Sequence, residues 1–292
     1  MRNLNRPGRN STDDYDLCVR RSNKPGKTRL QARHGEVMAQ YALYPDAKGR
    51  PHLVAETDSW GAPDADYQRK LYLKTYDGGL LGDLRGEAME LAEGRCPLCS
   101  AAPPEELDHF LPQSSHPALS IYGLNLVFAC GRCNLLKGQW CSSELARQFV
   151  HPYLEQIPRD RRFLICSPYA GGVLSPQYEI IDHPEIDPAL TQRLRWQFER
   201  LELSGRYRVE AVRHFRNRRS QWADVVAEGG FDALRLALQK ERSSFVDNLG
   251  VNDLLPAFMQ GLIDCPDFAV NAALRLALPQ PPPAAPPPPD DF

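Results

Sequence analysis

The chain has 292 residues, of which 42% are hydrophobic and 25% are charged, and this composition excludes the disordered and fibrous classes of protein. Its 35 Lys and Arg residues against 37 Asp and Glu residues give a formal net charge of -2. A protein held on nucleic acid by overall positive charge is therefore excluded, and any nucleic-acid site has to be local.

The composition and the start of the chain predict a cytoplasmic protein without a membrane partner. No apolar run approaches the roughly 18 residues that cross a bilayer, and the first residues lack the apolar segment of a signal peptide. In a reducing compartment, paired cysteines more often hold a metal or carry out redox chemistry than form disulfides. The spacing of the eight cysteines decides between these uses.

Residues 1–93 are predicted to form a helical N-terminal region. Ser11 and Thr12 are candidate N-caps of its first helix. Apolar side chains then recur at helical spacing, and we interpret them as facing the core. These stripes are Leu30, His34, Val37, Met38 and Tyr41, then Tyr67, Leu71 and Tyr72, then Leu80, Leu81, Leu84, Ala88 and Leu91. Nothing in this region points to a particular chemistry.

Residues 94–153 contain two pairs of cysteines with two residues between the partners. Cys96 and Cys99 form the first pair, and Cys130 and Cys133 form the second. Two such knuckles complete a tetrahedral four-cysteine zinc site. The alternative is two unrelated structural or redox pairs, but a redox pair would follow a βαβ pattern that is absent before Cys130. The 30 residues between the knuckles exceed the roughly 15 to 20 of a simple zinc ribbon, so a segment is inserted there.

The inserted segment begins with an Asp-His pair. Asp108 and His109 lie in an apolar run predicted to be a strand, where adjacent side chains point to opposite faces. One side chain can then hold an ion while the other faces a substrate. Taken alone, the dipeptide is better explained as a surface pair, or as a buried pair whose polar groups have hydrogen-bond partners. Asn125, before the second knuckle, and Asn134, directly after it, favour a functional site.

These residues together resemble the HNH endonucleases, which are also called ββα-metal nucleases. The chain is most similar to bacterial, often defence-associated HNH proteins that carry a Cys-Pro-x-Cys knuckle, a Leu-Asp-His-x-Leu-Pro run and a downstream His-Pro-Tyr. The matching segments here are residues 96–99, 107–112 and 151–153. The resemblance covers residues 94–153, about a fifth of the chain, and implies that these residues form the nuclease core.

The resemblance implies a role for each residue of the motif. His109 becomes the general base, Asp108 the first metal ligand and Asn134 the second, while Asn125 braces the loop that carries the base. Oxygen ligands suit Mg2+ or Mn2+ at this site, whereas the cysteines suit Zn2+. Lys137, about one helical turn after Asn134, is expected to face a phosphate.

One further feature separates the chain from its relatives, and two histidines are given no role in the site. Relatives commonly carry Lys-Ser after the Asp-His run, and Gln113-Ser114 stands there instead, so a phosphate-binding lysine is in doubt at that point. His116 is interpreted as a loop residue, and His151 as a capping or packing residue rather than a metal ligand.

The remainder of the chain is predicted to be a hairpin followed by helices. Apolar, partly β-branched runs at residues 163–166 and 178–181 flank Gly171 and Gly172, which indicates a hairpin and connector over residues 154–188. Helical spacing returns over residues 189–278, and the proline-rich residues 279–292 are expected to be disordered. The predicted fold class is α+β, mainly helical, with an inserted zinc-bound ββα-metal core.

An arginine-rich stretch at residues 205–219 could bind nucleic acid. In a helix, several of its arginines would share one face and track a phosphate backbone. The candidate residues are Arg206, Arg208, Arg213 and Arg216. The equally weighted alternative is a solvated face paired with Glu199, Glu202 and Glu210.

Three functions are consistent with these patterns. The first is a metal-dependent endonuclease that cleaves double-stranded DNA rather than RNA, which the resemblance places in anti-phage defence. The second is a zinc-stabilised nucleic-acid-binding or protein-binding module without activity. The third is a nuclease subunit that is active only with a partner such as an ATPase.

Overall fold

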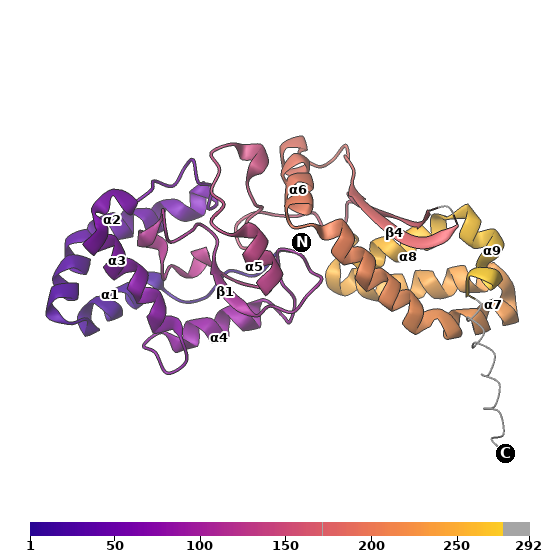
Figure 1. Cartoon of the computed structure of the whole chain (residues 1–292), viewed down its shortest axis with the longest axis horizontal. Coiled ribbons are helices and arrows are strands. Elements are labelled where there is room, and N and C mark those ends of the chain that lie inside the picture. The colour runs from indigo at the N-terminus through magenta and orange to yellow at the C-terminus, as the bar shows by residue number, and fades with distance from the viewer. Residues whose placement is uncertain (171, 277–292) are drawn as a thin grey trace, which may run out of the picture.

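The computed structural model describes residues 1–170 and 172–276, and the predicted tail at residues 279–292 lies outside the described residues. The molecule is elongated, with the first helices at one end and the last at the other (Figure 1). It is mainly helical and contains two small antiparallel sheets, each with two strands. The coarse prediction of a mainly helical α+β fold is therefore confirmed.

Four helices form the N-terminal region. They are α1 (Ser11–Arg21), α2 (Lys24–Ala47), α3 (Ala62–Leu71) and α4 (Gly82–Leu91), and the 3-10 turns Asp58–Trp60 and Tyr72–Thr75 flank α3. Asn10 caps α1 by accepting a hydrogen bond from the backbone of Thr12, so the prediction that Ser11 or Thr12 is the cap was wrong by one or two residues. The buried side chains of α2 include Tyr41 and Tyr44, which face the next part of the chain.

The segment with the inserted motif folds as two strands and a short helix. Strand β1 (Glu106–His109) pairs antiparallel with β2 (Leu126–Ala129), with His109 opposite Leu126. The chain between them includes the 3-10 turns Pro117–Leu119 and Gly123–Asn125. Helix α5 (Gly131–Lys137) follows β2 directly, and the sulfur of Cys130 caps it by accepting from the backbone of Cys133. This is a β-β-α order with a long connection between the strands.

A buried ion pair joins this segment to the next helix, α6 (Pro188–Arg200). The guanidinium of Arg193 contacts both oxygens of Glu155 and also donates to the carbonyl of Phe149. Burial is the largest single influence on Glu155 and acts to raise its pKa, but the hydrogen bonds and charge of Arg193, together with hydrogen bonds from the backbone of His151 and from Arg50, lower that pKa to about 2. Because removing one partner would leave a buried charge unpaired, this contact fixes the position of α6.

The C-terminal region is a hairpin covered by helices. Strands β3 (Leu164–Ala170) and β4 (Val173–Ile180) form the predicted hairpin, and they pack on α8 (Leu254–Asp264) and α7 (Leu203–Leu249). Helix α7 reverses direction at Gly230, whose φ of 67° suits glycine. The contact between His214 and Glu241 shows that the two halves of α7 lie side by side. Helix α9 (Pro266–Leu276) packs on α7.

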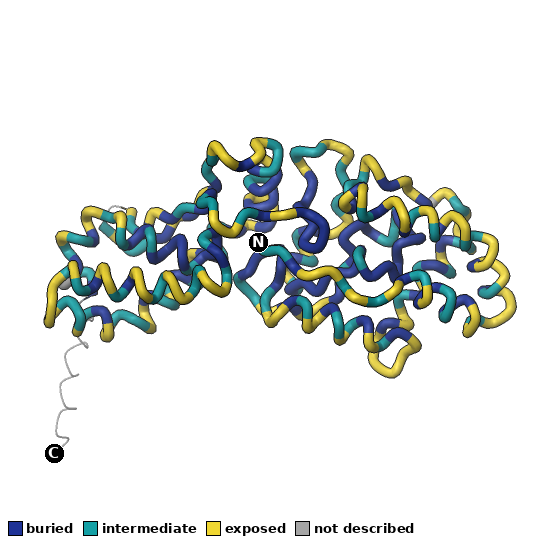
Figure 2. Tube along the Cα trace, turned by 180° about the vertical axis from the view of Figure 1, so that it is seen from behind, coloured by how far each residue is buried: buried dark blue, intermediate teal, exposed yellow. Residues whose placement is uncertain are grey.

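Buried side chains form one continuous apolar cluster from the first residues to α9. Figure 2 shows buried segments in the interior of both halves of the elongated molecule. The predicted divisions at residues 93, 153 and 188 therefore fall within a shared core, in which each region packs against its neighbours. Among the described residues, no helix is both long and apolar enough to span a bilayer.

Protonation of His151 is expected to make the stability of the protein sensitive to acid. His151 is fully buried, and burial lowers its pKa to about 3. At a pH below the ordinary histidine pKa of about 6.5, His151 binds a proton in the unfolded chain but not in the folded chain. The free energy of unfolding is therefore highest above that pH and falls as the pH drops toward the folded-state pKa. Between pH 7 and pH 5 this one group should cost about 2 kcal/mol.

Thermal unfolding at several pH values measures this effect. The variant His151→Gln should be less stable than the natural protein at pH 7 but should lose less stability on acidification. The matched control is His183→Gln, which changes a partly exposed histidine after β4. An equal pH dependence in His151→Gln and the natural protein would contradict the prediction.

Candidate functional site

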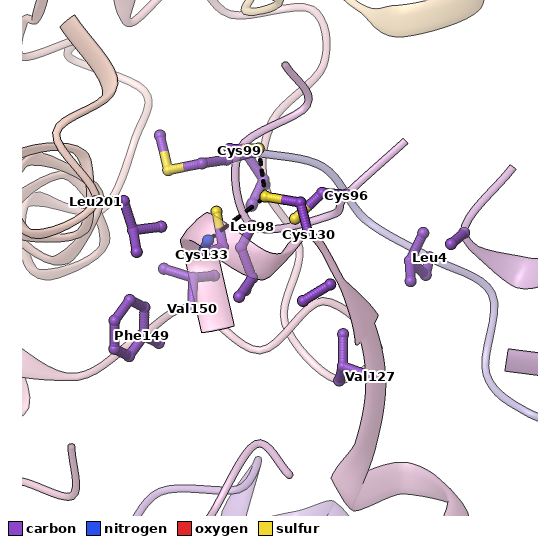
Figure 3. Packing of buried hydrophobic residues seen from close by; sticks show 14 of the residues in the cluster. Leu4, Cys96, Leu98, Cys99, Val127, Cys130, Cys133, Phe149, Val150 and Leu201 are labelled. Carbon is purple, nitrogen blue, oxygen red and sulfur yellow. Dashed lines mark hydrogen bonds between the residues drawn. The ribbon is translucent and has the colours of Figure 1, made fainter. Parts of the chain in front are cut away.

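The four paired cysteines meet in one buried cluster. Cys96 and Cys99 come from the turn after α4, and Cys130 and Cys133 come from the start of α5 (Figure 3). All four sulfurs lie within 4.8 Å of one another, and those of Cys99 and Cys130 are 3.9 Å apart. Tetrahedral bonds of about 2.3 Å to zinc place sulfurs about 3.8 Å apart, so the cluster fits a structural zinc ion.

Backbone amides and one arginine surround the sulfurs. The backbone N–H groups of Ala101 and Cys133 donate to the sulfurs of Cys99 and Cys130. The guanidinium of Arg206 donates to the sulfurs of Cys133 and Cys99 at 3.2 Å each and to that of Cys130 at 3.4 Å. Four thiolates exceed the charge of one zinc ion, and Arg206 offsets part of that excess.

The position of Arg206 corrects one of the predicted nucleic-acid contacts. Its guanidinium faces the cysteines, where no phosphate can reach it without displacing the sulfur contacts. The neighbouring Tyr207 is buried and donates its hydroxyl to the carbonyl of Cys99 at 2.7 Å. The first turn of α7 is thus bound to the cysteine cluster, a contact that the pattern of charges along the sequence does not reveal.

Two polar contacts bridge β1 and α5. Glu106 and Asp108 share one face of the strand because they are two residues apart, and Asn134 and Lys137 share one face of the helix because they are three apart. Nζ of Lys137 lies 3.0 Å from Oδ2 of Asp108, and the side-chain amide of Asn134 donates to Glu106. The two expected metal ligands, Asp108 and Asn134, therefore lie at the same strand–helix interface.

The prediction for Lys137 was wrong, and Glu106 was missed. Lys137 is only 2% exposed, and its ammonium also donates to the backbone carbonyl of His109, so it does not face a bound phosphate. Burial raises the pKa of Asp108, and the nearby charge of Lys137 opposes this shift. Glu106 adds a third oxygen-bearing side chain beside Asp108 and Asn134, and its spacing of two from Asp108 is the sequence signal that could have identified it.

His109 lies on the opposite face of β1, as the strand prediction required. Its ring is 8% exposed, and Nε2 lies 3.0 Å from the carbonyl oxygen of Ser120. A carbonyl only accepts, so Nε2 carries the hydrogen and Nδ1 is left with the lone pair. Burial lowers the pKa of His109 to about 4, so the ring is neutral and able to accept a proton at neutral pH.

Asn125 is fully buried and ties down the loop after β1. Its side-chain oxygen accepts from the backbone N–H of Leu111 and from the hydroxyl of Tyr44, each at 2.8 Å. Its amide nitrogen donates to the carbonyls of Leu111 and Leu119. The resemblance assigns Asn125 a bracing role, and these four hydrogen bonds describe a brace across the loop that ends at the Ser120 carbonyl.

His116 and His151, which were interpreted as a loop residue and a packing residue, are both buried. Because the Tyr44 hydroxyl donates to Asn125, Nε2 of His151 is the donor in its 3.2 Å contact with Tyr44, and Nδ1 accepts from the backbone of Tyr153. His151 therefore packs and positions Tyr44. His116 contacts Ser115 and the carbonyl of Val54, so it is a buried, hydrogen-bonded residue within the connection between the strands.

The other predicted arginines remain on the surface of α7. Arg208, Arg213 and Arg216 line a shallow depression together with the half-buried or exposed Val209 and Val212. Arg213 also pairs with Glu210, as the alternative interpretation expected for part of the stretch. Three of the four candidate arginines therefore share an exposed face, and the fourth, Arg206, does not.

Comparisons with known proteins give one distant similarity. The chain is 28% identical over 183 residues to the protein named Protein ea31 of Escherichia phage lambda. The match covers 60% of this chain and 57% of that protein, so the chain spans little more than half the length of this relative. No family model matches the chain, and no solved structure matches it.

The cysteine cluster is expected to hold one zinc ion that the fold requires. The variant Cys133→Ser should lose most of the bound zinc, and its free energy of unfolding should fall by about 4 kcal/mol or more, as is typical when a structural metal is lost. Metal analysis of the purified protein and denaturant unfolding measure the two effects. Cys166→Ser, which changes a buried cysteine outside the cluster, is the control, and equal zinc content in both variants would contradict the prediction.

Proposed function

We propose that the protein is a metal-dependent endonuclease of the HNH type that hydrolyses DNA phosphodiesters. The observation that carries the proposal is the arrangement around β1, where Asp108 faces the helix with Asn134 and His109 faces the opposite side. Two adjacent residues of one strand then supply a carboxylate ligand, from Asp108, and a neutral imidazole, from His109. Two of the four clustered cysteines, Cys130 and Cys133, lie at the start of the same helix, and the cluster joins that end of the helix to the turn after α4.

The donor atoms at the strand–helix interface suit a hard cation such as Mg2+ or Mn2+. Asp108 and Glu106 offer carboxylate oxygens, and Asn134 offers an amide oxygen once its side chain turns from donor to acceptor. A bound ion has to share the carboxylate of Asp108 with Lys137 or displace that ammonium. When bound, such an ion would neutralise negative charge that develops on a phosphodiester during hydrolysis.

His109 supplies the proton acceptor in this proposal. The hydrogen bond from Nε2 to the Ser120 carbonyl fixes the tautomer, so Nδ1 takes the proton of the attacking water. Because burial keeps the pKa of His109 near 4, protonation of this residue does not limit the reaction at neutral pH. Asn125 acts through the loop and keeps the Ser120 carbonyl in place.

A second candidate is a nuclease that becomes active only with a partner such as an ATPase. The described state of the site favours it, since Lys137 occupies the expected metal ligand Asp108 and His109 is only 8% exposed. A partner that moves α5 relative to β1 would free the carboxylate. The expected role in anti-phage defence rests on the resemblance alone and stays a prediction.

Plasmid cleavage with Mg2+ or Mn2+ tests the proposal. The natural protein should nick or linearise the plasmid, and His109→Ala should be slower by about 100-fold or more, the usual contribution of a general base. His183→Ala, which changes a histidine outside the site, should cleave like the natural protein. Equal cleavage by His109→Ala and the natural protein would exclude His109 as the base, and cleavage that needs an added ATPase partner would select the second candidate.

Arg208, Arg213 and Arg216, the three candidate arginines that are exposed on α7, are expected to contribute to DNA affinity. Each lost phosphate contact should reduce the slope of log affinity against log salt concentration by about 0.9. The triple variant Arg208→Gln, Arg213→Gln, Arg216→Gln should therefore flatten the slope, measured with a duplex oligonucleotide in Ca2+. The charge-matched control is Arg20→Gln, Arg21→Gln, Lys24→Gln around the end of α1. An unchanged slope in the α7 variant would refute the contact.

A further inference from the structure

A cluster from the N-terminal region covers the His109 side of β1. Tyr72, in the turn after α3, packs its ring against His109 with centroids 4.6 Å apart and donates its hydroxyl to the backbone carbonyl of Leu107. Arg85 of α4 reaches the same hydroxyl, with Nη2 3.4 Å from the oxygen. The guanidinium of Arg85 is thus separated from His109 by one aromatic ring.

Arg85 is held in place by neutral groups. Its guanidinium lies over the ring of Tyr76 at 4.6 Å and over that of Tyr72 at 6.0 Å, and Nε lies 3.4 Å from the carbonyl oxygen of Thr75. Aromatic faces and carbonyls position a guanidinium without neutralising it. The side chain is partly exposed, so solvent and ligands can reach it.

The charge of Arg85 has no carboxylate counterpart in the part of the chain that the structure describes. Other partly buried arginines of the N-terminal region are paired, as Arg9 is with Asp14 and Arg33 with Asp64. Burial raises the pKa of Tyr72 and the nearby charge of Arg85 opposes that shift, while the carboxylate of Asp108 is itself bound by Lys137. A fixed, unpaired guanidinium one aromatic ring away from an imidazole is suited to binding an anion, and phosphate oxygens match its fork of donors.

We propose that Arg85 binds a phosphate group of the nucleic acid at the His109 site, so that the N-terminal helices complete the site. This inference rests on the proposed nuclease function for the identity of the anion. Tyr72 is a positioning residue, because its hydroxyl links Arg85 to the backbone of β1. In the reaction, His109 takes a proton from the water that attacks the phosphodiester, and Arg85 contacts that phosphodiester. The positive charge of Arg85 stabilises the negative charge that develops on the phosphate oxygens.

The test compares Arg85→Gln and Arg85→Lys with Arg235→Gln. Arg235 also lies over an aromatic ring, that of Phe231 in α7, at 5.2 Å, and is remote from β1. Single-turnover cleavage of a duplex oligonucleotide is measured in Mg2+ or Mn2+, and duplex affinity is measured in Ca2+. Zinc content and melting temperature show whether each variant is folded.

Arg85→Gln should cleave about 100-fold more slowly than the natural protein, the usual loss when one donor to a developing oxyanion is removed. Arg85→Lys should recover part of the rate, because the charge is kept while the fork of donors is lost. Arg235→Gln should behave like the natural protein. Wild-type rates in folded Arg85→Gln would overturn the inference, as would equal loss in Arg85→Gln and Arg85→Lys with a lowered melting temperature, which indicates a structural role.

Failure of the nuclease proposal gives a different result. If the natural protein cleaves no DNA but Arg85→Gln lowers the affinity for the duplex while Arg235→Gln does not, the anion site stands without the nuclease function. If the natural protein cleaves DNA and Arg85→Gln does so equally well, the nuclease function stands without the Arg85 contact. If duplex affinity and cleavage are both independent of Arg85, the inference is wrong whatever the activity.

Discussion

The hydrogen bonds of Asn125 are the constraint on which the candidate site depends. A buried amide loses free energy for every polar atom left without a partner, so its four partners are held together as a set. Those partners are Tyr44, both backbone groups of Leu111 and the carbonyl of Leu119. The loop fixed in this way presents the Ser120 carbonyl to His109, and that contact decides which imidazole nitrogen can accept a proton.

The compact motif is completed by residues outside it on both sides. Tyr44 reaches Asn125 from α2, and Tyr72 and Arg85 approach β1 from the segments before it. On the other side, Arg206 and Tyr207 of α7 hold the cysteine knuckles. The helical regions therefore contribute residues to the candidate site as well as covering it. One apolar cluster also runs through all of these regions.

The sequence could predict what depends on short spacing, and it could not predict contacts between distant segments. The cysteine pairs and the second hairpin follow from spacing and from β-branched runs, and the structure contains both. The contact of Tyr44 with Asn125 joins residues 81 positions apart, and no periodicity marks it. Arg206 was predicted from a run of basic residues and Lys137 from its spacing after Asn134, and both were misplaced because packing decides which side chains are turned inward.

The contacts of Arg206 couple metal binding at the cysteines to the docking of the first turn of α7. Its donors bind thiolates more strongly than thiols, and a bound metal keeps the cysteines deprotonated. Metal binding and the docking of the start of α7 therefore favour each other to the same extent. Loss of the metal would therefore weaken the attachment of the first turn of the helix that carries Arg208, Arg213 and Arg216.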